Sequence, residues 1–176
     1  MSGNKAKRIA VRHALLVVSI AISATIAETV LRYIFPLDVQ TVFDHRIPHP
    51  DFGWVLEPGA SFLNKIAEDT VRVTYNSEGW RDAEHSVDID RKAFRVLVLG
   101  DSFMEGYSVE LEDSFHRQLE RLGRKDGIDM EVINFGVGGY GTLQEYLVFE
   151  EVGKRYNPDL VLLGFFVEND VRNNSI

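Results

Sequence analysis

The sequence predicts an α/β fold in which a parallel β-sheet carries helices on both faces and follows a transmembrane helix. Apolar strands alternate with helical segments from residue 93 onward, the pattern that produces a parallel sheet. Each strand runs into a loop of small or polar residues, as expected at the edge where open sheets bind ligands. A long apolar stretch follows a basic amino terminus, which is typical of a membrane anchor.

The first part of the chain divides into a basic tail, residues 1–13, and a predicted anchor, residues 14–35. The uncharged core of the anchor is about 14 residues long, or about 21 Å of helix, and a bilayer core is about 30 Å thick. Apolar residues resume after Glu28, which gives the helix enough length to span. Glu28 and Arg32 are spaced to pair on one helix face, and Pro36 is expected to end the helix.

The basic tail predicts a cytoplasmic amino terminus, with the rest of the chain periplasmic or extracellular. The first dozen residues contain no acidic side chain and four basic ones, which are Lys5, Lys7, Arg8 and Arg12. This excess of positive charge sets the predicted orientation. A cleaved signal peptide is the alternative, with Thr25-Ile26-Ala27 as its cleavage signal, and a buried core helix is a third interpretation. We favour the uncleaved signal-anchor because of the apolar residues beyond Glu28.

Residues 36–92 are predicted to form a turn-rich leader with one short strand at 70–75, where polar and apolar residues alternate. Its aromatic and basic side chains have two possible uses. They either dock the leader onto the main domain or line a sugar-binding site. Docking is the commoner use and the favoured interpretation for these residues, which are Phe52, Trp54, Trp80 and Arg81.

Residues 93–176 carry the predicted sheet, with strands at 94–99, near 132–135 and at 160–163. Helices are predicted near Ser114–Leu122 and Thr142–Arg155, with Gly123 and Gly153 at their ends. Apolar residues recur at helical spacing on both and are expected to pack against the sheet: Phe115, Leu119 and Leu122 on the first helix, and Leu143, Tyr146, Leu147, Phe149 and Val152 on the second.

Three strand ends deliver a serine, a glycine cluster and an asparagine to one edge of this sheet. Gly100-Asp101-Ser102-Phe103 follows the first strand, Asn134 to Thr142 follows the second, and Glu168-Asn169-Asp170 follows the third. Acyl transfer needs these groups, because a hydroxyl attacks the carbonyl while N–H groups and an amide hold the oxyanion. Taken alone, the first of these loops is also a common turn and helix cap.

These three segments resemble the sequence blocks of the SGNH hydrolases, also called the GDSL family of esterases and lipases. The resemblance covers about half of the chain, residues 93–176, and implies a three-layer α/β/α (flavodoxin-like) domain of which this is the amino-terminal part. It implies Ser102 as the nucleophile. It implies an oxyanion hole made of the Ser102 and Gly139 N–H groups and the Asn169 side chain, with Gly138 as a less favoured substitute for Gly139.

The family's histidine base belongs to a later Asp-x-x-His block, which does not occur before Ile176. None of the five histidines follows Asn169; they are His13, His45, His49, His85 and His116. His116 is expected to be a surface or half-buried helix residue, and the others lie in the basic tail, a proline-rich loop or a polar turn. We therefore expect the sequence to be the amino-terminal part of a longer enzyme.

Composition excludes several other functions. The net charge of −8 argues against nucleic-acid binding, and a chain without cysteine forms no disulfide or thiolate metal site. We expect no metal and no cofactor. The expected substrate is an acylated small molecule or carbohydrate, with O-acylated envelope carbohydrate favoured by the anchor and by family habit.

Two alternatives to an esterase remain at this stage. Gly136 to Gly141 satisfies a dinucleotide-binding fingerprint after a strand, with Glu168 available for ribose. However, the strand is not the first of its unit, and that interpretation leaves Ser102 and Asn169 unexplained. The other alternative is a non-catalytic protein that keeps the fold in order to bind glycans or a partner.

Overall fold

The computed structural model describes residues 2–33, 45–66, 69–87 and 92–174, with the side chains of residues 2–6 and 169 outside that description. The chain divides into two compact units, Met1–Val39 and Gln40–Ile176. Most of the predicted leader therefore belongs to the same unit as the sheet.

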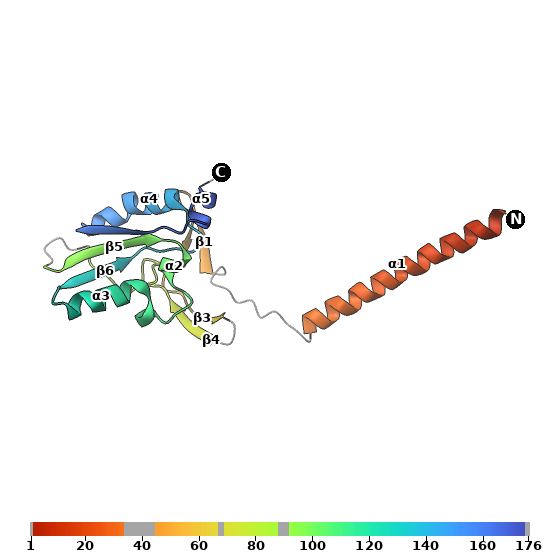
Figure 1. The fold of residues 1–176 in the computed structure, drawn as a ribbon, viewed down its shortest axis with the longest axis horizontal. Helices are drawn as coiled ribbons and strands as arrows, with labels where there is room; N and C mark the ends of the chain where they lie inside the picture. Colours follow the sequence, from red (N-terminus) through yellow and green to blue (C-terminus); the bar gives the residue numbers. More distant parts are fainter. Residues whose placement is uncertain (1, 34–44, 67–68, 88–91, 175–176) are drawn as a thin grey trace. The chain divides into compact units, whose positions relative to one another are not determined.

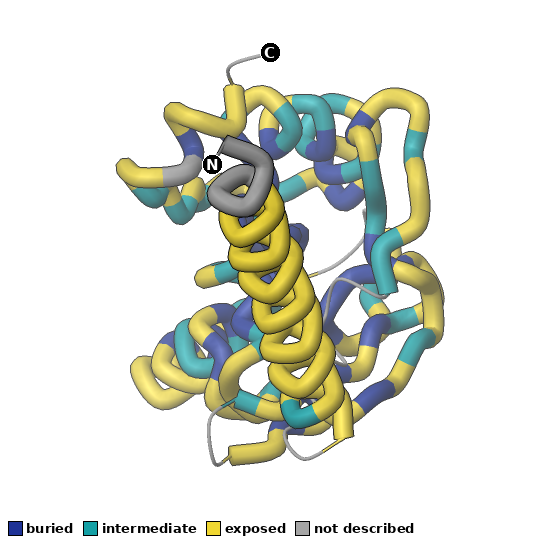
Figure 2. The backbone as a smooth tube through the Cα atoms, turned by 90° about the vertical axis from the view of Figure 1, so that its right-hand side faces the viewer, coloured by how far each residue is buried: buried dark blue, intermediate teal, exposed yellow. Residues whose placement is uncertain are grey.

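In its described residues the first unit is one helix, α1 (Ser2–Tyr33), whose stretch from Lys7 to Tyr33 is long and apolar enough to cross a membrane. Its side chains are exposed almost throughout the described range, as Figure 2 shows in yellow. The predicted pair between Glu28 and Arg32 is present at 2.7 Å. Pro36 lies outside the described residues.

The second unit is built on a parallel sheet of three strands, which confirms the predicted fold class. β5 (Phe94–Gly100) is central, between β6 (Met130–Asn134) and β7 (Leu160–Gly164) (Figure 1). The register pairs Val98 with Asn134 and Gly100 with Gly164. All three carboxyl ends therefore lie at one edge of the sheet.

Helices cover both faces of this sheet. Val148 of α4 (Thr142–Glu151) shares a buried cluster with Leu97 of β5. Leu119 of α3 (Phe115–Lys125) packs instead with Val96 of β5. Since neighbouring residues of a strand point to opposite faces, the two helices lie on opposite sides of the sheet (Figure 1).

The face that α3 buries differs from the predicted one. Phe115 and Leu122 are exposed, whereas His116 and Glu120 are buried. Tertiary partners explain this reversal, because Glu120 accepts a hydrogen bond from the Val132 N–H and His116 lies among polar groups described below. His116 is thus neither a surface residue nor a half-buried one.

Two further details of the helices differ from the prediction. Gly123 lies inside α3, where a Cβ would come within 2.9 Å of the Met130 sulfur, so the glycine serves close packing and not helix termination. The second helix ends at Glu151 and continues after Val152 as a 3₁₀ turn, η3 (Gly153–Tyr156). On α4, Leu143 and Tyr146 are exposed.

The leader contributes two antiparallel hairpins to the second unit. One pairs β1 (Arg46–His49) with β2 (Gly53–Leu56), and the other pairs β3 (Ser61–Ile66) with β4 (Asp69–Thr74). β4 corresponds to the predicted strand, and the other three strands were not predicted. Their buried side chains join the cluster that also contains Val148 of α4, and they include Leu56, Phe62, Val71 and Val73.

The docking interpretation of the leader is confirmed for its four candidate residues, since Trp54 also packs edge-on against Tyr140. Phe52 and Trp80 are buried in the core, and Arg81 is fully buried. The Arg81 guanidinium donates to the backbone carbonyls of Glu105, Gly106 and Val109, which ties the leader to the segment that follows β5. These are packing and anchoring contacts, as expected for docking.

A second polar connection surrounds the buried side chain of Asp82. Its carboxylate accepts hydrogen bonds from the backbone N–H groups of Ala83 and Asn134 and pairs with His85 and His116 at 3.2 Å each. Burial alone would raise the pKa of Asp82, but the two histidines outweigh it and hold that pKa well below its usual range. For His85, burial would lower the pKa, and its pairing with Asp82 and Glu131 raises it instead.

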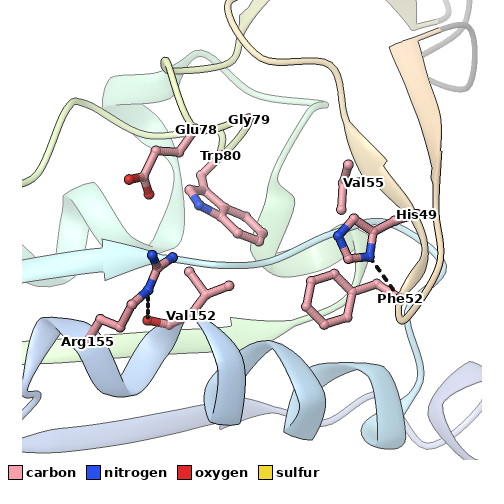
Figure 3. A pocket seen from close by; sticks show the side chains of 8 residues that line it. All are labelled: His49, Phe52, Val55, Glu78, Gly79, Trp80, Val152 and Arg155. Atoms are coloured by element: carbon pink, nitrogen blue, oxygen red, sulfur yellow. Dashed lines mark hydrogen bonds between the residues drawn. The ribbon is translucent and has the colours of Figure 1, made fainter.

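A hollow of about 340 Å³ lies between the leader and the end of α4. Figure 3 shows Phe52, Trp80 and Val152 beside it, each from a different segment of the chain. Phe52 and Trp80 line this hollow, but the other two candidate sugar-binding residues do not, because Arg81 points to backbone carbonyls and Trp54 lies beside Gly139.

Glu145 is a buried carboxyl group on α4, at an apolar groove lined by Phe149 and Leu163. Within the described part of the chain, neither of its carboxyl oxygens has a hydrogen-bond partner. Burial, followed by the charges of Asp170 and Asp101, raises the pKa of Glu145 to about 8. The folded chain therefore keeps a proton that the unfolded chain releases near pH 4.5.

This bound proton predicts a specific pH dependence of stability. The wild-type free energy of unfolding should fall as pH rises from about 4.5 to about 8, because the buried carboxyl must ionise. Glu145→Gln should remove much of that slope and raise stability at pH 8.5, measured by urea unfolding across pH 5 to 8.5. Glu151→Gln, at an exposed position on the same helix, is the control. Equal slopes in Glu145→Gln and the wild type would contradict the assignment.

Candidate functional site

Ser102 stands at the turn between β5 and a short helix, α2 (Ser102–Glu105). The turn is tight, because a Cβ on Gly100 would lie 2.4 Å from the Met104 Cγ. Asp101 caps α2 by accepting a hydrogen bond from the Phe103 N–H at 2.9 Å. The local sequence therefore fixes Ser102 as the first residue of α2, just beyond the carboxyl end of the central strand.

The Ser102 side chain is accessible. Ser102 is partly exposed and borders an open hollow of about 390 Å³, together with residues from β3 and the segment after α2. Ile66, Tyr107 and Val109 give part of this hollow an apolar lining. A nucleophile in this position can be reached by a substrate with an apolar group.

The glycine cluster after β6 meets Ser102 directly. A Cβ built on Gly138 would lie 3.4 Å from the Ser102 Cβ, so the two residues are in contact across the sheet edge. Gly139 follows with φ +83°, a backbone conformation that glycine adopts without strain. Two of the three predicted segments are thus brought together.

The N–H groups of the two glycines differ in their use. The Gly138 N–H donates to the Glu105 Oε2 at 2.6 Å and is already engaged. The Gly139 N–H, in contrast, donates no hydrogen bond to any of the described residues. The preference for Gly139 over Gly138 as an oxyanion donor stays a prediction.

Glu105 is the buried carboxylate beneath this turn. It accepts hydrogen bonds from the Gly138 N–H and from the Tyr75 hydroxyl, the latter at 2.9 Å. Burial raises the pKa of Glu105, and the two hydrogen bonds together with the positive charges of Arg46 and Arg81 oppose that shift. Sequence reasoning missed Glu105 and Arg46, because only the folded chain brings them to the glycines.

Asn169 is the first residue of α5 (Asn169–Asn173), which follows β7 after a short loop. The Asn169 side chain lies outside the described residues. The same helix does approach the glycine turn, because Asn173 donates to the Gly139 carbonyl oxygen at 2.8 Å. The third segment is therefore close to Gly139 through α5. The predicted role of the Asn169 amide stays a prediction.

The four described histidines of the second unit have other partners than Ser102. His45 pairs with Glu57, and His49 accepts from nearby backbone N–H groups. His85 and His116 are held by Asp82 in the core. Within the described part of the chain, no hydrogen bond connects a histidine ring to Ser102, so these histidines provide no observed base for it.

The glycine loop offers little to a dinucleotide. Its N–H groups at Gly136 and Gly138 are bound to Asn134 and Glu105, and the latter is a carboxylate that would repel a pyrophosphate. A Cβ on Gly141 would meet the side chain of Asn174 at 2.8 Å, so α5 covers that part of the loop. Among the described residues, the geometry therefore does not support the dinucleotide interpretation.

No protein-family model and no curated protein matches the chain. Among solved structures, it is similar to the crystal structure of AlinE4, an SGNH-hydrolase family esterase, with 28% sequence identity and a TM-score of 0.38. The match covers 42% of this chain and 40% of the AlinE4 chain, and a variant of AlinE4 matches equally. The chain thus spans less than half of that esterase.

Substitution of Tyr75 tests whether the buried Glu105 side chain connects the leader to the glycine turn. Tyr75→Phe leaves the buried carboxyl group of Glu105 without one of its hydrogen-bond donors, so the free energy of unfolding should fall by about 1–3 kcal/mol. Urea unfolding monitored by tryptophan fluorescence measures this change. Tyr146→Phe, on the exposed surface of α4, should have no measurable effect. Equal stability of the two variants would argue against this connection.

Proposed function

We propose that the protein is a serine esterase in which Ser102 attacks the carbonyl carbon of an ester. The observation that supports this most directly is the contact between Ser102 and Gly138, on an accessible sheet edge, beside the turn that contains Gly139. A hydroxyl next to preorganised N–H donors is the arrangement that acyl transfer requires.

The proposed reaction has two steps. The Ser102 oxygen bonds to the ester carbon while its proton passes to a base, and the carbonyl oxygen becomes an oxyanion. The N–H groups of Ser102 and Gly139 and the Asn169 amide stabilise that oxyanion. The alcohol then leaves with a proton, and water hydrolyses the acyl-enzyme to release the acid and restore Ser102. We expect this base to be a histidine.

The proposed substrates are O-acyl groups of envelope carbohydrate. Support comes from α1, because a membrane anchor with a basic flank would place the hydrolase domain on the outer side of the membrane. The partly apolar hollow beside Ser102 is suited to an acyl chain. Transfer of the acyl group to a second hydroxyl, in place of water, would use the same first step.

Substitution of Ser102 and Asn169 tests the reaction in the full-length protein. Ser102→Ala should abolish hydrolysis of p-nitrophenyl acetate and labelling by a fluorophosphonate, because no acyl-enzyme can form. Asn169→Ala should lower kcat by about 100-fold or more, since one oxyanion donor is lost. Ser61→Ala, at an exposed position on β3, is the control and should keep full activity. Normal hydrolysis by Ser102→Ala would reject the proposed function.

The membrane topology is tested by reporter fusions. Alkaline phosphatase fused after the chain should be active in a Gram-negative host, and green fluorescent protein at the same place should stay dark, because both report export of the second unit. Changing all four basic residues of the tail to glutamine should weaken this orientation. A bright fluorescent fusion to the unchanged chain would contradict the proposed localisation.

A further inference from the structure

We propose that Arg46, contributed by the leader, is a positioning residue for the Ser102 site: it holds the peptide unit between Gly138 and Gly139 so that the Gly139 N–H faces the reacting oxygen. This inference rests on the proposed esterase function. It assigns the leader hairpin β1–β2 a direct part in the site, beyond docking.

Arg46 reaches the glycine turn from a distant part of the sequence. Its Nη2 donates to the Gly138 carbonyl oxygen, 92 positions further along the chain. A Cβ on Gly138 would lie 2.8 Å from this Nη2, 2.9 Å from the Glu105 Oε2 and 3.4 Å from the Ser102 Cβ. The guanidinium, the buried carboxylate and the serine therefore surround one glycine.

The hydrogen bonds hold Gly138 at both of its polar groups. Glu105 accepts from the Gly138 N–H at 2.6 Å, and Arg46 donates to the Gly138 carbonyl oxygen. The charges match these roles, because a carboxylate binds the donor and a guanidinium binds the acceptor. The backbone on both sides of the Gly138 Cα is thereby fixed.

The orientation of the Gly138 carbonyl determines that of the next N–H. The Gly138 C=O and the Gly139 N–H belong to one planar trans peptide unit and point in opposite directions. A unit between two glycines rotates easily, because neither residue has a Cβ that restricts it. A rotated unit would turn its carbonyl oxygen toward Ser102 and repel the oxyanion. Arg46 opposes that rotation.

Packing contacts hold the Arg46 side chain in this position. Its guanidinium lies over the Trp54 ring, 5.2 Å from the ring centroid, and Trp54 packs edge-on against Tyr140 at 5.5 Å. The Tyr140 hydroxyl donates to the Trp54 carbonyl oxygen, which ties β2 to the glycine loop. A planar guanidinium can stack on Trp54 and bind Gly138 at once, which a lysine ammonium does less well.

Substitution of Arg46 in the full-length protein tests the inference. Arg46→Met should lower kcat for p-nitrophenyl acetate by about 10- to 100-fold, because one oxyanion donor loses its alignment. KM should stay within about threefold, and the inhibition constant of a boronic acid that forms a tetrahedral adduct with Ser102 should rise by the factor lost in kcat. Arg46→Lys should restore part of kcat. The control is Arg72→Met, an exposed position on β4.

A second readout follows the peptide unit without any reaction. In the full chain, in detergent micelles and labelled with ¹⁵N-glycine, the Gly139 amide signal should shift and show exchange broadening in Arg46→Met but not in Arg72→Met. An unchanged Gly139 signal would overturn the inference whatever the activity. So would a loss confined to KM, or kinetics equal to those of the control. Absence of Ser102-dependent hydrolysis in the wild type would reject the proposed function separately, and the amide signal would still decide the role of Arg46.

Discussion

The site depends on one buried carboxylate, Glu105. It lies on the short helix that carries Ser102, and it binds the Gly138 N–H and the Tyr75 hydroxyl. One side chain thus connects the serine loop, the glycine loop and the leader. A carboxyl group in a buried position is costly unless its lone pairs are satisfied, and here hydrogen bonds and nearby arginines supply that compensation.

The same principle explains why the leader and the sheet form one compact unit. Arg81 of the leader satisfies three backbone carbonyls around the end of α2, and Asp82 satisfies a backbone N–H of Asn134 while pairing with two histidines. Arg81 and Asp82 are both buried, and each has partners across the boundary between the leader and the sheet. Separation of the leader would leave them unpaired, which is why we treat the leader as part of the site.

Helical periodicity predicted the faces of α3 and α4 in part: Leu119 on α3, and Leu147 and Phe149 on α4, pack against the core as expected. It placed Phe115 and Leu122 against the sheet, but both are exposed, and His116 and Glu120 lie inside. A periodic pattern counts apolar residues on a helix face and has no information on polar partners from elsewhere in the chain. Where a partner such as Asp82 is available, a histidine can be buried at low cost.

The sequence by itself determined the order of strands and helices along the chain. It also showed that the loops containing Ser102, Gly139 and Asn169 follow the carboxyl ends of the three strands. Those are local properties, because apolar strands, glycine turns and helix caps depend on neighbouring residues. It also determined the apolar helix α1. Only the tertiary structure decided that Glu105 and Arg46 hold the two ends of Gly138. Such contacts join residues far apart in the chain, and no local pattern marks a charged side chain whose partner is a backbone group elsewhere.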